Sequence, residues 1–205
     1  MYISLFYERD LTMEVKTDRR IRKTRAQLRS GLARLLQSKS INEITVKELV
    51  DEVDINRSTF YLHYTDIYSM LDEIEKELLE EIGRAINTHP IGLNKDTFSF
   101  IGDIFSILLE NKEICRALIG TNGDIAFIHK IEDIIAQNSM KTLAPMFPGA
   151  LEDLKYSYSF CLNGTIGLIK TWLLENNDES PAHMAELTYK MVTNAMHTFY
   201  QSKDI

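Results

Sequence analysis

The sequence has 205 residues and a mass of 23.7 kDa, which corresponds to one or two domains of ordinary size. Hydrophobic residues make up 44% and charged residues 26%, which excludes wholesale disorder, and Gly (9) and Pro (4) are too few for a collagen-like or turn-rich all-β chain. The net charge of −7 excludes a polybasic nucleic-acid coat protein, and two cysteines exclude a disulfide framework and indicate a reduced, cytoplasmic protein.

The charge is distributed unevenly along the chain. Residues 14–64 hold 11 Lys+Arg against 7 Asp+Glu, a net charge of +4, whereas residues 65–205 hold 11 against 21, a net charge of −10. A basic head on an acidic body suggests that only the head meets a polyanion, although a solvated helix face would also explain the charge. The basic residues concentrate in one stretch: Lys16, Arg19, Arg20, Arg22, Lys23, Arg25 and Arg29.

Residues 1–13 carry no recognisable motif and form a predicted N-terminal extension. Met13, its last residue, is another possible start of translation. Thr17 or Asp18 can cap a first helix that runs to about Ser38. Its apolar face consists of residues spaced by three and four: Leu28, Leu32, Leu35 and Leu36.

Two short helices follow the first one. Thr45-Val46-Lys47-Glu48 is a capping box, in which the Thr45 oxygen accepts from the third backbone N–H and Glu48 reaches back. Asn56 can cap the next helix after a three-residue turn, and Phe60 and Tyr64 are spaced as core residues. Three helices with this turn predict a helix-turn-helix domain over residues 14–66.

Residues 67–205 predict a second domain that is also helical. Its first helix carries an apolar stripe, Ile67, Leu71, Ile74, Leu78 and Ile82, and a face expected to be solvated: Asp72, Glu73, Glu75, Glu77, Glu80 and Glu81. Further helices are predicted at 95–110, 112–119, 125–143, 150–176 and 181–203. No segment alternates with period two, and no apolar run approaches the ~18–20 residues that span a bilayer. We therefore expect an all-α protein without a membrane segment.

The words "TRAQLRSGLARLLQSK" at 24–39 and "ITVKELVDEVDINRSTFYLHYTD" at 44–66 resemble the DNA-binding domain of TetR-type transcriptional regulators. The resemblance implies a variable all-α regulatory domain whose last two helices dimerise. Gly164-x-x-Gly167, Trp172 and Ser180-Pro181 also resemble a C-terminal subgroup that includes regulators of dihydroxyacetone metabolism. Three positions depart from the pattern: Asp54 replaces the usual turn Gly, Val50 a small residue, and Ile67 a phosphate-contacting Lys.

The N-terminal residues of a recognition helix face base edges in the major groove, which is where Arg57, Ser58 and Thr59 lie in the predicted motif. Arg57 can bond bidentately to guanine O6 and N7. The resemblance adds contacts from matching positions elsewhere in the domain. The predicted DNA-binding residues are Thr45, Lys47, Arg57, Ser58, Thr59, Tyr61, His63, Arg22 and Arg25.

Both C-terminal helices carry two apolar stripes, and one stripe of each needs a partner outside its own domain. Gly164 and Gly167 would let backbones approach closely. The predicted homodimer interface consists of Tyr158, Cys161, Gly164, Thr165, Leu168, Trp172, Leu187, Met191 and Ala195. A fully buried helix in a monomer is the alternative.

Large apolar side chains in residues 95–160 are core residues or line an effector pocket, which the resemblance implies for this region. The predicted pocket residues are Phe98, Phe105, Phe127, His129, Met140, Phe147, Tyr156, Phe160 and Asn163. His129 and Asp133 have the spacing of two metal ligands without a third, so a surface pair is favoured.

The sequence contains no P-loop, GxGxxG, HExxH or GxSxG motif, so we expect no enzyme, no cofactor and no metal. The resemblance implies a sequence-specific regulator of transcription, by family default a repressor released from a palindromic operator by a small molecule. Its partners would be double-stranded DNA, a second copy and an unknown effector. A co-regulator of the same fold that acts through a partner protein remains the alternative.

Overall fold

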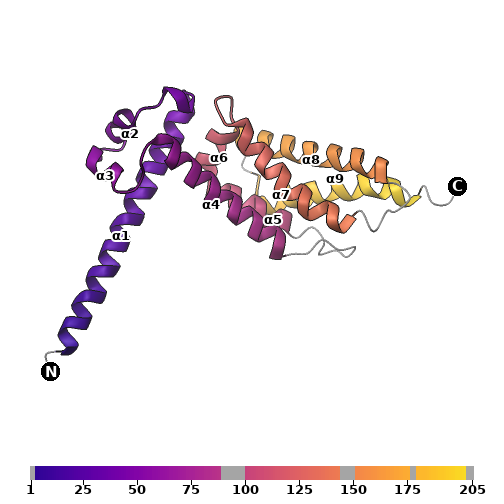
Figure 1. Cartoon of the computed structure of the whole chain (residues 1–205). Helices are drawn as coiled ribbons and strands as arrows, with labels where there is room; N and C mark the ends of the chain where they lie inside the picture. The colour runs from indigo at the N-terminus through magenta and orange to yellow at the C-terminus, as the bar shows by residue number, and fades with distance from the viewer. Residues whose placement is uncertain (1–2, 89–99, 144–150, 176–178, 202–205) are drawn as a thin grey trace.

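A computed structural model describes the backbone of residues 3–88, 100–143, 151–175 and 179–201, and the side chains of residues 19–88, 100–137, 153–175 and 179–195. The described residues are helical and contain no strand, which confirms the all-α prediction. A long helix and two short ones form the N-terminal unit, and α4 leads from it into the C-terminal bundle (Figure 1).

The N-terminal unit consists of α1 (Ile3–Leu36), a 3-10 turn (Ile41–Glu43), α2 (Val46–Glu52) and α3 (Arg57–Tyr61). The predicted cap at Thr17 or Asp18 was wrong, because α1 begins at Ile3 and continues through both residues. No Gly or Pro interrupts residues 3–30, so a capping residue within this run does not start a new helix. The predicted boundary after residue 13 therefore falls inside α1.

The capping box at the start of α2 is only half formed. The Thr45 hydroxyl accepts from the Glu48 backbone N–H at 3.2 Å, as predicted. The Glu48 carboxylate, however, accepts from Lys39 Nζ instead of reaching back to the backbone of Thr45. Both donors would give the carboxylate a charge-assisted hydrogen bond, and Lys39 adds the attraction of an opposite charge.

The turn between α2 and α3 depends on Asp54, which has a positive φ of 52°. The following Ile55 N–H donates to the Val50 carbonyl at 3.0 Å, which closes the end of α2. Asp tolerates the left-handed conformation that the family usually gives to Gly, so the replacement keeps the turn. Phe60 and Tyr64 are buried beneath it, which confirms their prediction as core residues.

Gly31 marks the closest approach of α1 to α2. A Cβ atom there would lie 2.3 Å from Val53 Cγ1 and 3.1 Å from Leu49 Cδ1, whereas a Cβ on Gly83 would meet nothing within 4 Å. The χ1-restricted Val53 cannot swing away without cost. The absence of a side chain at Gly31 therefore allows the two helices to approach closely.

We expect Gly31→Ala to destabilise the protein by about 1–2 kcal/mol, because overpacking outweighs the helix propensity that Ala adds. Gly83→Ala, in the interior of α4, should instead stabilise it by about 0.5–1 kcal/mol. Urea unfolding of both variants measures the difference, and adding Val53→Ala to Gly31→Ala should recover part of the loss. Equal effects of the two alanines would contradict the close approach.

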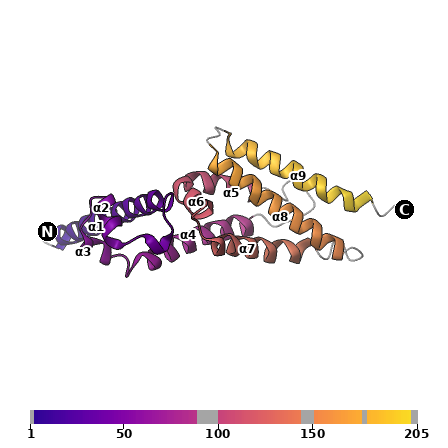
Figure 2. The same ribbon diagram turned by 90° about the horizontal axis from the view of Figure 1, so that it is seen from above.

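The C-terminal bundle consists of α4 (Ile67–Thr88), α5 (Phe100–Glu110), α6 (Lys112–Ile119), α7 (Ile125–Leu143), α8 (Leu151–Leu174) and α9 (Pro181–Gln201). The apolar stripe predicted on α4 is buried throughout. Figure 2 shows α8 and α9 side by side, and α9 also packs against α5. None of the described helices is long and apolar enough to cross a membrane.

Trp172 is part of this bundle's core. Its ring packs edge-on against Phe105 with centroids 5.2 Å apart, and its Nε1–H donates to the Glu179 carbonyl at 3.0 Å. The side chain is buried within the single chain. Its prediction as a dimer-interface residue was therefore wrong, because Phe105 of α5 and the Glu179 carbonyl already contact this side chain.

Candidate nucleic-acid interface and regulatory cavity

The outer face of α3 presents an arginine and a tyrosine that hold each other. The Arg57 guanidinium donates to the Tyr61 hydroxyl, with Nη2 at 3.1 Å, and lies 5.6 Å from the centre of the Tyr61 ring. Both side chains are exposed, while Phe60 between them is fully buried. The buried ring fixes the orientation of α3, and the exposed pair is available to a partner.

Further predicted contact residues surround this pair. Thr45 and Lys47 at the start of α2 and Ser58 on α3 are exposed, and Thr59 and His63 are half-buried. They lie at the start of α2 and on or just after α3, the two helices that the turn at Asp54 joins. Ile67, which replaces the family's phosphate-contacting Lys, is buried at the start of α4 and offers no polar group.

Leu62 belongs to the same surface, and sequence reasoning missed it. It is 81% exposed at the end of α3, next to Tyr61. The signal was present, because Leu62 lies two residues from both Phe60 and Tyr64, and helical spacing places it away from the face that they share. An exposed aliphatic side chain here can contact a thymine methyl group.

The two predicted arginines of α1 have different surroundings. Arg22 is exposed. Arg25 donates from Nε to the Tyr64 hydroxyl at 3.1 Å and forms ion pairs with Glu73 and Glu77 of α4. The hydrogen bond to Tyr64 raises the pKa of Arg25 above its usual value. Its guanidinium therefore ties α1 to α4 instead of pointing outward.

Arg29 extends this connection into the C-terminal bundle. It pairs with Glu77 at 3.1 Å and donates to the Asn111 side-chain oxygen at 2.9 Å. Ser30 bonds Glu113 of α6 at 2.8 Å. Part of the positive charge that the sequence assigns to a polyanion is thus neutralised by the acidic face of α4, which leaves fewer basic groups for DNA.

A cavity of about 130 Å³ lies inside the bundle. Helices α5, α7 and α8 supply most of its lining, and the rest comes from Ile82 of α4, Cys115 and Ile119 of α6, and Val192 of α9. The large apolar residues of the lining include Ile101, Ile104, Phe105, Leu108, Phe127, Ile128, Ile131, Leu162, Ile166 and Ile169. Because α4 also leads into the N-terminal unit, a molecule in this cavity would touch the element that carries α1 to α3.

The cavity includes only part of the predicted pocket. Phe105 and Phe127 line it, whereas Tyr156 and Phe160 are 71% and 75% exposed and face away from it. Asn163 is exposed and donates to the Ser159 carbonyl at 2.8 Å, and His129 is bonded to Glu132 at 2.9 Å. The prediction that these four residues line the pocket was therefore wrong. The predictions for Phe98, Phe147 and the Met140 side chain lie outside the described residues.

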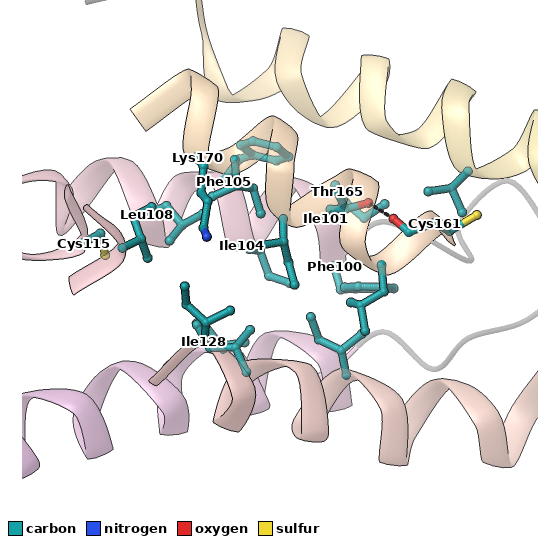
Figure 3. Close-up of a pocket in the computed structure, with 18 of the residues that line it drawn as sticks. Phe100, Ile101, Ile104, Phe105, Leu108, Cys115, Ile128, Cys161, Thr165 and Lys170 are labelled. Carbon is teal, nitrogen blue, oxygen red and sulfur yellow. Dashed lines mark hydrogen bonds between the residues drawn. The ribbon is translucent and has the colours of Figure 1, made fainter. Parts of the chain in front are cut away.

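Different residues supply the polar groups of the cavity: Tyr158, Thr165 and Lys170 of α8. Figure 3 shows the Lys170 nitrogen pointing from α8 into the space that Ile104 and Ile128 border. The Thr165 hydroxyl donates to the Cys161 carbonyl at 2.8 Å. The sequence missed Lys170 because a single lysine within an apolar helix gives no sign of the direction in which its side chain points.

Both cysteines also line the cavity. Burial raises the pKa of the Cys115 thiol to about 12, and burial likewise raises the pKa of Cys161. Both thiols are therefore protonated at neutral pH and behave as small apolar groups.

An exposed apolar face runs along α8 and continues onto α9. Its α8 part carries Tyr156, Phe160 and Gly164, and Met191 of α9 is 55% exposed beside it. A groove of about 400 Å³ between the two helices is lined by Phe160, Gly164, Leu168 and Met191, among others. A Cβ on Gly164 or Gly167 would meet nothing within 4 Å in the single chain.

The predicted interface residues divide between this face and the interior. Gly164 and Met191 are exposed, and Leu168, Leu187 and Ala195 are half-buried. Tyr158 lines the cavity, and Cys161 and Thr165 line both the cavity and the groove. The rings that the sequence analysis assigned to the pocket, Tyr156 and Phe160, instead extend this face.

A buried carboxylate connects α4 with α7. Glu75 is only 2% exposed, and its Oε2 accepts from Lys130 Nζ at 2.8 Å. Burial raises the pKa of Glu75, and Lys130 opposes that rise. In the described part of the chain the second oxygen of Glu75 has no hydrogen-bond partner. The prediction that Glu75 is solvated was wrong, because α7 covers that turn of α4.

Known proteins resemble both parts of the chain. Residues 95–194 match the TetR family described as the transcriptional regulator C-terminal region. The uncharacterized HTH-type transcriptional regulator YxbF of Bacillus subtilis (strain 168) is 24% identical over 184 residues, which are 82% of this chain and 44% of that protein. The chain thus spans less than half the length of this curated relative.

Two solved structures are also similar. The TetR transcriptional regulator from Streptococcus agalactiae 2603V is 21% identical, with a TM-score of 0.52 over 87% of this chain and 98% of that one, which indicates a shared fold. The dihydroxyacetone kinase operon activator DhaS is 16% identical, with a TM-score of 0.47 over 86% of this chain and 96% of that one. The expected relationship to regulators of dihydroxyacetone metabolism stays a prediction.

Proposed function

We propose that this chain, whose residues 95–194 match the TetR C-terminal region, is a TetR-family regulator of transcription: a homodimeric, sequence-specific DNA-binding protein that acts in the cytoplasm. The observation that carries the proposal is the exposed Arg57–Tyr61 pair on α3, held in place by buried Phe60. An α-helix fits the major groove, and an arginine at its N-terminal end reaches guanine. A regulator of this kind needs no catalytic group, and we assign none.

The dimer would form through the exposed face of α8 and α9. A second copy would cover Phe160 and Met191, and Gly164 and Gly167 would let the two backbones come close. Two-fold symmetry would then present two α3 helices to two half-sites. This arrangement favours DNA over a co-regulator role, since Lys47 and Arg57 are both exposed on the same surface.

Regulation would come from the cavity. A ligand that fits one dimer geometry better than the other changes DNA affinity by that difference, and DNA changes ligand affinity equally. The contact of Ile82 with the cavity supplies the physical connection through α4. We propose repression released by the ligand as the mode of action.

The test is selection of bound sequences from random DNA by the purified protein. We expect a partly palindromic site with half-sites about one helical turn (~10 bp) or more apart, and an affinity that falls steeply with salt. Failure to enrich any sequence, together with no binding to bulk DNA at low salt, would reject the proposal in favour of the co-regulator.

Arg57→Ala should weaken binding to the selected site by about 1–3 kcal/mol and relax the preference at one base pair in each half-site. Fluorescence anisotropy with the selected site and with single-base variants measures both effects. Arg84→Ala, which removes an exposed arginine from α4, is the matched control and should bind as the wild type does. An equal loss of affinity for all DNA sequences would instead show that Arg57 contacts a phosphate and not a base.

A further inference from the structure

The cavity in the C-terminal bundle has one charged group in its lining. That group is the ammonium of Lys170, and the other lining residues are aliphatic or aromatic, with the hydroxyls of Thr165 and Tyr158 and two thiols. No Asp or Glu lines the cavity, and across the described ranges no carboxylate forms an ion pair with Lys170. The electrostatic character of the site is therefore positive.

The direction of this side chain makes the charge available to a ligand. The nitrogen points into the apolar space near Ile104 instead of away from the bundle (Figure 3), and Lys170 is half-buried. An ammonium beside apolar surface loses hydration and is stabilised by an anionic hydrogen-bond acceptor. A cationic ligand would meet repulsion with no acid to offset it.

The volume limits the apolar part of the ligand. The cavity measures about 130 Å³. An engineered apolar cavity of about 150 Å³ in another protein holds one benzene molecule. The body of the ligand should therefore be close to a single aromatic ring or an aliphatic chain of about six carbons.

We propose that the effector is a small monocarboxylate with a compact apolar body, whose carboxylate pairs with Lys170 Nζ while the body fills the space between α5, α7 and α8. This rests on the proposed function, since it names the ligand class of the regulatory cavity. The Thr165 hydroxyl already donates its proton to the Cys161 carbonyl. It can therefore accept a hydrogen bond from a ligand but cannot donate one to a carboxylate. Lys170 is thus the group that selects the charge of the ligand.

The experiment compares three ligands of similar size that differ in charge: hexanoate, its isostere hexanamide, and hexylamine. Benzoate, benzamide and benzylamine form a second series with a ring. Binding is measured by titration calorimetry and by the shift in melting temperature, in wild type and in Lys170→Met, which keeps an unbranched side chain without the charge. Lys155→Met, which removes an exposed lysine from the same helix, is the matched control.

We expect the acid to bind wild type about tenfold more tightly than the amide, and the amine to bind most weakly. In Lys170→Met the preference for the acid should fall to about twofold or less, while the affinity for the amide stays unchanged; a fold defect would weaken both. Lys155→Met should keep the wild-type preference.

Three results would overturn the inference: an amide that binds wild type as tightly as the acid, an acid preference that survives in Lys170→Met, or no binding by any member of either series. DNA binding by the ligand-free protein is measured separately. A Lys170-dependent acid preference in a protein that binds no DNA would support the carboxylate site and reject the proposed regulatory function.

Discussion

Gly164→Arg is expected to convert the proposed dimer into a monomer at micromolar concentration. In the single chain the position is exposed and a Cβ there meets no atom within 4 Å, so the arginine costs the monomer nothing sterically. In the proposed dimer two symmetry-related arginines would enter the apolar face beside Phe160 and Met191. Burying unpaired charge costs several kcal/mol, so the dissociation constant should rise by about 1,000-fold or more.

Sedimentation velocity measures the mass of the variant in solution. Fluorescence anisotropy with a DNA that contains both half-sites measures its affinity for DNA. The monomer should lose most of its affinity, because each half-site would then be bound independently instead of through a linked pair. Gly83→Arg, on α4, is the control, since a Cβ there is equally unobstructed and the position lies away from the α8–α9 face. A variant that stays dimeric would place the interface elsewhere.

Lys130→Met is expected to destabilise the protein by about 2–3 kcal/mol near neutral pH, because it leaves the Glu75 carboxylate buried without its partner. The loss should be below that of a fully buried pair, since the Lys130 side chain is 48% exposed. Glu75 itself is only 2% exposed, so water cannot replace the lysine at Oε2.

The pH dependence of this loss follows from the raised pKa of Glu75. The folded state holds the Glu75 proton more tightly than the unfolded state does, so stability falls as pH rises from the ordinary Glu pKa of about 4.3 through the raised value. Lys130 opposes the rise, and its removal raises the pKa of Glu75 further. The destabilisation should therefore be largest near pH 8 and shrink toward pH 5 as the carboxyl takes up a proton.

Urea unfolding at four pH values between these limits measures the effect. Adding Glu75→Gln to Lys130→Met should restore most of the stability, and Lys76→Met, which removes an exposed lysine from the same turn of α4, should have little effect. A loss that does not change with pH would show that Lys130 acts through packing and not through the charge of Glu75.

Local sequence signals predicted much of the fold. The bounds of α6 and α7 agree with the predicted ranges 112–119 and 125–143, because a Gly-containing break separates two runs with clear helical periodicity. The Asp54 turn and the burial of Phe60 and Tyr64 were also predictable, since they depend on residues within a few positions of one another. The start of α1 was not, because a capping residue within a run of good helix formers does not reveal whether it is used.

The sequence by itself determined which face of each N-terminal helix is apolar, and this agrees with the packing of α2 on α1 and of α3 on α2, with Arg57 outward. Only the tertiary structure decided the places of Glu75, Lys170 and Phe160. Helical periodicity gives the direction of a side chain about its own axis, but burial depends on whether another helix covers that direction. Helix α7 covers Glu75, whereas α5 and α7 face Lys170 across a cavity, and no described helix covers Phe160. Glu75 is therefore a buried, ion-paired carboxylate, Lys170 a lysine that lines a cavity, and Phe160 an exposed ring.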